Sequence, residues 1–102
     1  MKALKIVASG TYHYTGDTTP RRVAIVLADH DYWYEYAKAA NDLESGQLPV
    51  VDDEGHAFYL SYSNISEGGT FRPDSRTHRT FADAKFDADK RAPSPITWLE
   101  TT

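Results

Sequence analysis

The run Val23-Ala24-Ile25-Val26-Leu27-Ala28 most constrains the fold, because every one of its positions is apolar. A strand that is apolar on both sides needs cover on both faces, which is typical of a central strand in a sheet. Six residues are far fewer than the roughly 20 that a membrane-spanning helix needs, so we expect no membrane partner. The sequence therefore predicts one domain over residues 1–102, built around a sheet that contains residues 23–28.

Residues 4–14 alternate between apolar and polar side chains, as a strand with one buried face does. The apolar side chains at positions 4, 6, 8, 12 and 14 share one parity, and Gly10 marks a bend. Residues 15–20 are rich in turn-forming types. We therefore expect residues 4–14 and 23–28 to form an antiparallel hairpin.

Residues 32–44 show the period of an amphipathic helix, with Asp29 or Asp31 as its N-cap and Gly46 beyond its end. One arc of this helix is apolar and holds Tyr32, Trp33, Tyr36, Ala37, Ala39, Ala40 and Leu43. Tyr34 is the single large ring on the opposite, polar arc. The pattern predicts that the apolar arc packs on the sheet and that Tyr34 faces outward.

The rest of the chain predicts a second hairpin over residues 49–62, an irregular segment over 64–80 with an optional strand at 76–80, and a short last strand at 96–99. Residues 81–91 alternate like a strand, but alanine, aspartate and lysine are poor strand formers, so we expect a helix that Pro93 stops. Six large side chains are expected in the core: Trp33, Tyr36, Phe58, Leu60, Tyr62 and Trp98. Tyr59 is expected on an outer face. The element order ββα-ββ-(β)-αβ indicates an α+β domain with four to six mostly antiparallel strands and two helices packed on them.

The net charge is −4, and residues 29–57 alone carry eight acids against one lysine, a net −7. Phosphate contacts need a cationic surface, so this acidity argues against nucleic-acid or anionic-membrane binding and suits a basic protein partner. The alternative is a solvated acidic face that keeps a small protein in solution. The chain contains no cysteine, which excludes disulfides and thiolate metal sites and suits a reducing, cytoplasmic location.

The sequence contains no phosphate-binding loop, dinucleotide fingerprint, nucleophile elbow or His-Glu-x-x-His pattern. Asp29-His30-Asp31 has no second histidine at metal-ligand spacing, so it favours a helix cap. Asp52-Asp53-Glu54 lacks the alternating acids of a calcium loop, so it favours a hairpin turn. We therefore expect no catalytic residues, no metal and no cofactor.

Residues 68–81 concentrate Arg72, Arg76, His78 and Arg79 in one polar segment. Arginine forks match phosphate and carboxylate groups, so this segment indicates a ligand or phosphate site. If residues 76–80 form a strand, Arg79 points away from Arg76 and His78. The alternative is a connector whose arginines pair with the acidic middle of the same chain.

The leading hypothesis is a small, acidic, non-enzymatic binding or inhibitor module that engages a basic surface of a partner protein. Its contact residues would be Tyr34, Glu35 and Asp42 on the first helix, together with Asp52, Asp53 and Glu54. In size, acidity and lack of catalytic motifs the chain is similar to accessory proteins of phages and mobile elements, which act by binding a host protein, anti-defence inhibitors among them. The alternatives are nucleotide or nucleic-acid binding through residues 68–81, an enzyme with a histidine–carboxylate site, and a structural subunit, including a homodimer through an open sheet edge.

Overall fold

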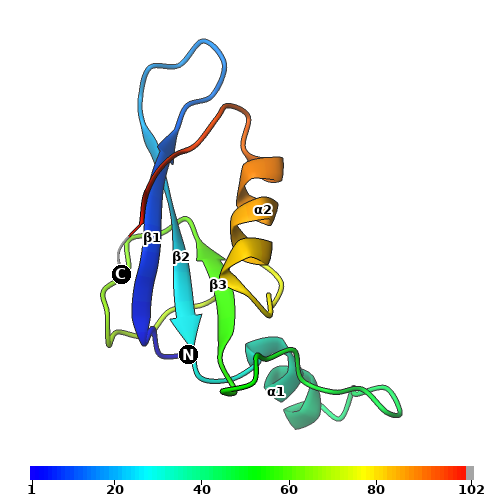
Figure 1. Ribbon diagram of the computed structural model, residues 1–102. Helices are drawn as coiled ribbons and strands as arrows, with labels where there is room; N and C mark the ends of the chain where they lie inside the picture. The colour runs from blue at the N-terminus through cyan, green and yellow to red at the C-terminus, as the bar shows by residue number, and fades with distance from the viewer. Residues whose placement is uncertain (101–102) are drawn as a thin grey trace.

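The computed structural model describes residues 1–100 and shows a four-stranded antiparallel sheet with two helices (Figure 1). The elements in chain order are β1 (Lys5–Tyr12), β2 (Arg21–Ala28), α1 (Tyr32–Ala39), β3 (Ala57–Ser61), α2 (Phe81–Arg91) and β4 (Thr97–Glu100). The strands are arranged in the order β3-β2-β1-β4. The predicted α+β class is confirmed. No helix within residues 1–100 has the length and apolar character to cross a bilayer.

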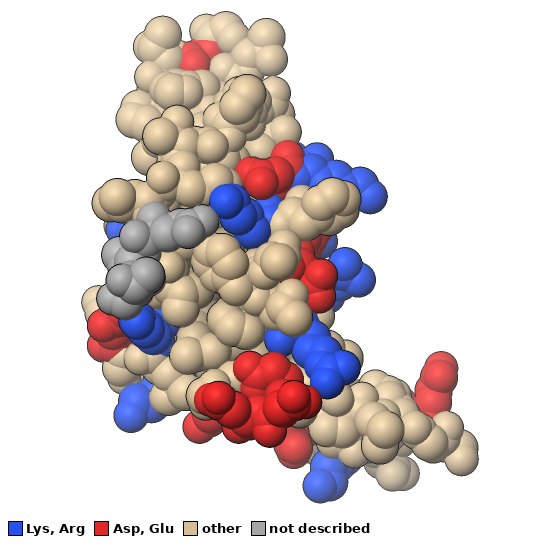
Figure 2. Space-filling view, in the orientation of Figure 1, with Lys and Arg blue, Asp and Glu red and all other residues tan. Residues whose placement is uncertain are grey.

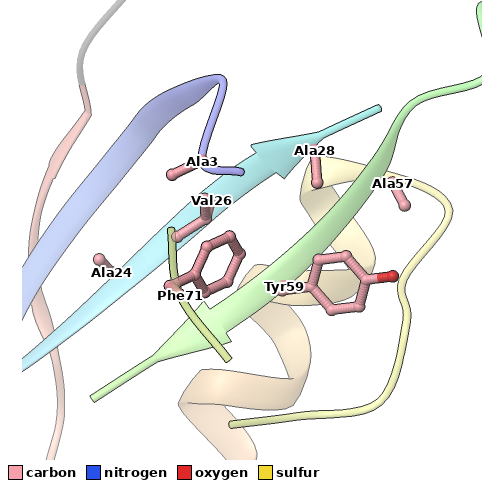
Figure 3. Packing of buried hydrophobic residues seen from close by; sticks show 7 residues of the cluster. All are labelled: Ala3, Ala24, Val26, Ala28, Ala57, Tyr59 and Phe71. Atoms are coloured by element: carbon pink, nitrogen blue, oxygen red, sulfur yellow. The ribbon is translucent and has the colours of Figure 1, made fainter. Parts of the chain in front are cut away.

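Strand β2 is the buried centre of the sheet, as its apolar run predicts. Val23 and Ile25 pack on the face that α2 covers, whereas Ala24 and Val26 belong to a second buried cluster on the opposite face. Phe71 belongs to that second cluster and covers it from a segment far away in the sequence (Figure 3). Both faces of β2 are therefore shielded from solvent.

The parity predicted for β1 is wrong before Ala8, because the strand contains a bulge. The pairing register with β2 shifts between Ile6 and Ala8. A bulge moves the following residues to the other face, since side chains alternate along a strand. Ile6 consequently packs with the cluster of Val26, while Val7 and Ala8 pack with the cluster beneath α2.

Helix α2 confirms the helical interpretation of residues 81–91. Thr80 caps it by accepting a hydrogen bond from the Asp83 backbone N–H at 3.1 Å, and the helix ends at Arg91, two residues before Pro93. Ala84 and Ala88 lie one turn apart and are buried against the sheet. Their small side chains allow α2 to lie close to the strands. The alanines of this segment therefore form the buried face of a helix, although their alternation is also compatible with a strand.

Helix α1 differs from its prediction in both length and packing. It ends at Ala39 rather than near residue 44, and Asn41 adopts a left-handed conformation with φ 59° just beyond it. None of its residues is fully buried, and of its side chains only Tyr32 and Trp33, in the first turn, pack against the core cluster of Val26. Together with the following loop it projects from the end of the sheet (Figure 1). We call residues 32–50 the arm.

The predicted second hairpin is also wrong, because residues 49–51 do not form a strand. The turn itself is present: the Asp52 N–H donates to the His56 carbonyl at 2.8 Å, and the Gly55 N–H donates to the Asp52 carbonyl at 3.0 Å. β3 is paired on its free edge by a different segment, residues 71–78, which we call the strap.

The strap closes the outer edge of β3 without forming a strand. Phe58 and His78 exchange two backbone hydrogen bonds of 2.9 Å, an isolated bridge where the sequence allowed a strand at 76–80. The Leu60 N–H donates to the Ser75 hydroxyl at 2.9 Å, and the Asp74 N–H donates to the Leu60 carbonyl at 3.0 Å. Side-chain and main-chain hydrogen bonds from the strap thus replace a neighbouring strand.

The expected aromatic core is confirmed only in part. Leu60 is buried, but Tyr62 and Tyr36 are exposed; Trp33, Phe58 and Trp98 are half-buried. Tyr59, expected on an outer face, is completely buried. The reason is that this face of β3 is covered by the strap, including the Phe71 ring at 6.4 Å between ring centroids (Figure 3).

Candidate functional site

A groove of about 910 Å³ lies between the arm and the strap. The beginning of α1 and the residues near Val50 form one wall, the outward side of the strap forms the other, and Arg91 reaches in from the end of α2. The walls come from three segments that are remote in sequence. Their geometry therefore depends on how the arm is held to the strap.

Asp31 holds the arm in place. It is only 6% exposed, and its Oδ1 accepts hydrogen bonds from the Tyr34 N–H at 3.1 Å and the Thr77 hydroxyl at 2.7 Å. Its Oδ2 accepts a hydrogen bond from the Val50 N–H at 2.8 Å. One carboxylate thus caps α1, fixes the end of the arm and binds the strap, which confirms the predicted N-cap role.

Tyr59 supports the same junction from the sheet. Its hydroxyl accepts a hydrogen bond from the Tyr32 N–H and lies 3.1 Å from the Thr77 hydroxyl oxygen and 3.2 Å from the His30 carbonyl oxygen. Burial raises the pKa of Tyr59, so the phenol stays neutral and can keep donating. The start of α1 is therefore anchored from within the core.

Trp33 connects the arm to the strap within the groove. Its indole Nε1 donates to the Ser75 carbonyl at 2.8 Å, and the Arg72 guanidinium carbon lies 6.0 Å from the centroid of its ring. The Tyr32 ring lies beside it, 4.9 Å between centroids. The indole is therefore held in one orientation by a hydrogen bond and by packing.

The strap residues that the sequence singled out are separated by the fold. Arg72 and Arg76 both line the groove and are exposed, and neither forms an ion pair within residues 1–100. Arg79 instead lies 3.4 Å from Asp53 in an exposed ion pair. His78 is 2% exposed. The structure thus brings Arg72 and Arg76 together, but not His78 and Arg79.

His78 belongs to the core rather than to a surface site. Its Nε2 lies 2.8 Å from Asp87 Oδ2, and its Nδ1 lies 3.2 Å from the Phe58 carbonyl oxygen. Arg91 Nε donates to the other Asp87 oxygen at 2.9 Å. Burial alone would raise the pKa of Asp87, but these hydrogen bonds outweigh it and hold the pKa below its ordinary value. A ligand cannot reach the His78 ring, which corrects its place in the predicted site.

A second charged surface gathers around His56. We call Asp29, Asp52, Asp53 and Glu54 the acidic patch. Asp52 Oδ1 accepts hydrogen bonds from the His56 and Glu54 N–H groups, each 2.9 Å long, and the His56 bond has the larger part in lowering the pKa of Asp52. The hydrogen bond to His30, 2.7 Å between Nδ1 and Oδ1, lowers the pKa of Asp29. Figure 2 shows acidic side chains gathered at this end of the molecule, beside the arm.

The residues predicted to contact a partner lie on the arm and in this patch, with one difference. Glu35 and Asp42 are exposed, and the Asp53 side chain is 99% exposed. Tyr34 is half-buried and lines the groove instead of facing outward. The exposed aromatic ring of the arm is Tyr36, which sequence reasoning assigned to the core. Asn41 is the signal that marks the early helix end, because asparagine tolerates the left-handed conformation.

No group of three or more His, Asp or Glu side chains in the described part of the chain is arranged to hold a metal ion. No protein-family model, curated protein or solved structure matches the sequence or the fold. Function must therefore be argued from the arm, the patch and the groove themselves.

Proposed function

We propose that the chain is a non-enzymatic protein-binding module of the inhibitor type, with the arm and the acidic patch as its contact surface. One observation carries this proposal: no residue of α1 is fully buried, and Tyr36 remains exposed although Tyr32 and Trp33 of the same helix pack against the core. Tyr36 is 62% exposed, and Leu48, further along the arm, is 78% exposed. An apolar surface on a projecting element is typical of an interaction site.

The energetics of short helices support this role. An isolated helix of eight residues is marginal in water, and most helices gain their stability by packing an apolar face. Here the cap and the Trp33 contacts hold only the first turn. A partner that covered Tyr36 would supply the missing burial, and tyrosine is enriched at such interface centres.

The charges of the surface indicate the chemistry of the partner. Glu35 and Asp42 lie on the arm, and the acidic patch adjoins it (Figure 2). Opposite charges speed association and select partners more than they raise affinity. The partner we propose is therefore a protein with a basic surface and an apolar depression for the Tyr36 ring. The lack of cysteine suits a cytoplasmic partner, as for accessory inhibitors carried by mobile elements.

The test is affinity capture from nuclease-treated lysate of the source organism, repeated with charge-reversed variants. Glu35→Lys/Asp42→Lys should lose the captured protein. Asp83→Lys/Asp89→Lys is the matched control, because it makes the same change in net charge at exposed positions of α2, away from the arm, and should keep the captured protein. Circular dichroism confirms that both variants fold. Equal capture by both variants would contradict the proposed surface.

A further inference from the structure

The groove is a cationic site in an acidic molecule, and we propose that it binds a nucleoside monophosphate. Three arginines line it, Arg72 and Arg76 from the strap and Arg91 from α2. The chain as a whole carries a net charge of −4. Arg91 is paired with Asp87, but Arg72 and Arg76 have no carboxylate partner among the described residues, and such unpaired arginines in an acidic molecule point to an anionic ligand.

The two strap arginines supply the phosphate end of the site. Both are exposed and neither has an ion pair within the described residues, so their guanidinium forks are available for two-point hydrogen bonds to phosphate oxygens. Arg91 donates through Nε to Asp87, which leaves its terminal nitrogens unused by that bond. Three cations thus face one groove.

The two carboxylates of the groove limit how much negative charge it accepts. Asp31 is saturated by two backbone N–H groups and the Thr77 hydroxyl, and Asp74 accepts a hydrogen bond from the Tyr62 N–H at 2.8 Å. With three arginines and two aspartates the lining has a net charge of +1. This balance suits one phosphate group better than three.

The aromatic wall supplies the other end of the site. Trp33 and Tyr34 both line the groove, and the Trp33 ring is fixed in advance by its hydrogen bond to the Ser75 carbonyl. A fixed ring loses little freedom when a base stacks on it. The Arg72 guanidinium now occupies this face loosely, at 6.0 Å, and can turn toward a phosphate when a base takes its place.

The size of the groove agrees with such a ligand. Its volume of about 910 Å³ lies within the range of known small-molecule sites and greatly exceeds the space that a bare phosphate fills. The site also differs from the one that the sequence indicated, since it gains Trp33, Tyr34 and Arg91 and excludes the buried His78.

The test is a titration of the ¹⁵N-labelled full chain with AMP, and separately with GMP, CMP and UMP, followed by NMR. The chain has two tryptophans, so two indole signals report on two places. The Trp33 signal should shift and saturate with at least one nucleotide. The Trp98 indole donates to Asp89 at 2.9 Å, does not line the groove, and should stay unchanged as an internal control.

Arginine variants show whether the phosphate is bound where we propose. Arg72→Gln/Arg76→Gln should weaken nucleotide binding by about tenfold or more, because charge-assisted hydrogen bonds are lost. Arg22→Gln/Arg79→Gln removes the same charge from exposed positions outside the groove and should leave the affinity unchanged.

Three results would overturn the proposal. The first is no saturable shift of Trp33 at millimolar nucleotide. The second is an equal affinity for inorganic phosphate, which would mean that no base is recognised. The third is tighter binding of a phosphotyrosine peptide or a short single-stranded oligonucleotide than of any mononucleotide. None of these results contradicts the protein-binding proposal, which rests on Tyr36, Glu35, Asp42 and the acidic patch, all outside the groove lining.

Discussion

At the scale of single residues, Asp31 has the widest structural effect. Its carboxylate joins the arm, the end of the loop at Val50 and the strap through hydrogen bonds of 3.1, 2.8 and 2.7 Å. The residue that caps α1 is therefore also the residue that shapes the groove. The capping role was predictable from the local sequence, since aspartate before a helix is a common cap. Its bond to Thr77 was not, because nothing local connects residues 31 and 77.

We predict that Asp31→Ala lowers the free energy of unfolding by about 2–4 kcal/mol, since it removes a helix cap and leaves three partly buried donors without this acceptor. Asp31→Asn should lower the free energy of unfolding by less, because its Oδ1 still accepts from Tyr34 and Thr77. Some cost should remain, because the amide NH₂ group cannot accept from the Val50 N–H. Urea unfolding followed by circular dichroism measures both. The exposed Asp53→Ala is the control and should leave the unfolding midpoint in place. An Asp31→Ala midpoint equal to that of the native chain would refute the role given to this carboxylate.

At the scale of elements, a helix or strand was predicted well when its own residues specify it, and poorly when distant residues do. β2 and α2 were predictable because their own residues specify them: a doubly apolar run, and Thr80 followed by alanines one turn apart. The bulge in β1, the short α1 and the strap were not. The bulge and the strap depend on partners distant in the sequence, as Ser75 does when it accepts from the Leu60 N–H, whereas the end of α1 has a local signal in Asn41. The candidate groove shares this limit, because its walls come from three separate segments.

Gly10 is an element-scale feature, since it allows β4 to approach β1. A Cβ atom on Gly10 would lie 2.5 Å from Ile96 Cγ2 and 3.0 Å from Trp98 Cε3. We therefore predict that Gly10→Ala displaces β4 and costs about 1–3 kcal/mol of unfolding free energy. The Trp98 indole signal in NMR should move with it. Thr11→Ala, at the exposed next position, is the control and should change stability by less than about 0.5 kcal/mol. An unshifted Trp98 signal in Gly10→Ala would show that β4 does not need this glycine.

At the scale of the whole molecule, the chain is elongated, with extents of 46 × 26 × 21 Å. The arm projects from one end of the sheet, and the β1–β2 turn projects from the other (Figure 1). Its radius of gyration of 14.4 Å accordingly exceeds the roughly 13 Å of a compact domain of this length. Stability is therefore concentrated in the sheet and α2, while the proposed contact surface lies outside them.

The loss of folding stability at acid pH should depend on the protonation of the Asp87 carboxylate. Its pKa is depressed in the folded protein, so its contribution to stability is present above the ordinary value of 3.8 and is lost as the pH falls through the folded value. Asp87→Asn should lower the free energy of unfolding by about 1–3 kcal/mol near neutral pH, because His78 loses a buried partner. The difference from the native chain should be constant down to about pH 5 and should shrink as the pH falls below about 4. Urea unfolding at each pH measures this, with Asp53→Asn as the control. A difference that stays constant with pH would show that the ion pair does not carry the effect.

The alternation of side chains along the strap has a consequence for how this protein can change over time. Ser75 and Thr77 point into the fold and hold it together, whereas Arg72 and Arg76 face solvent. If the groove binds the nucleotide that we propose, mutations at the two outward positions should alter the preferred ligand without weakening the edge of the sheet. Selection, or an engineer, can therefore vary ligand preference and structural integrity almost independently within a single eight-residue segment.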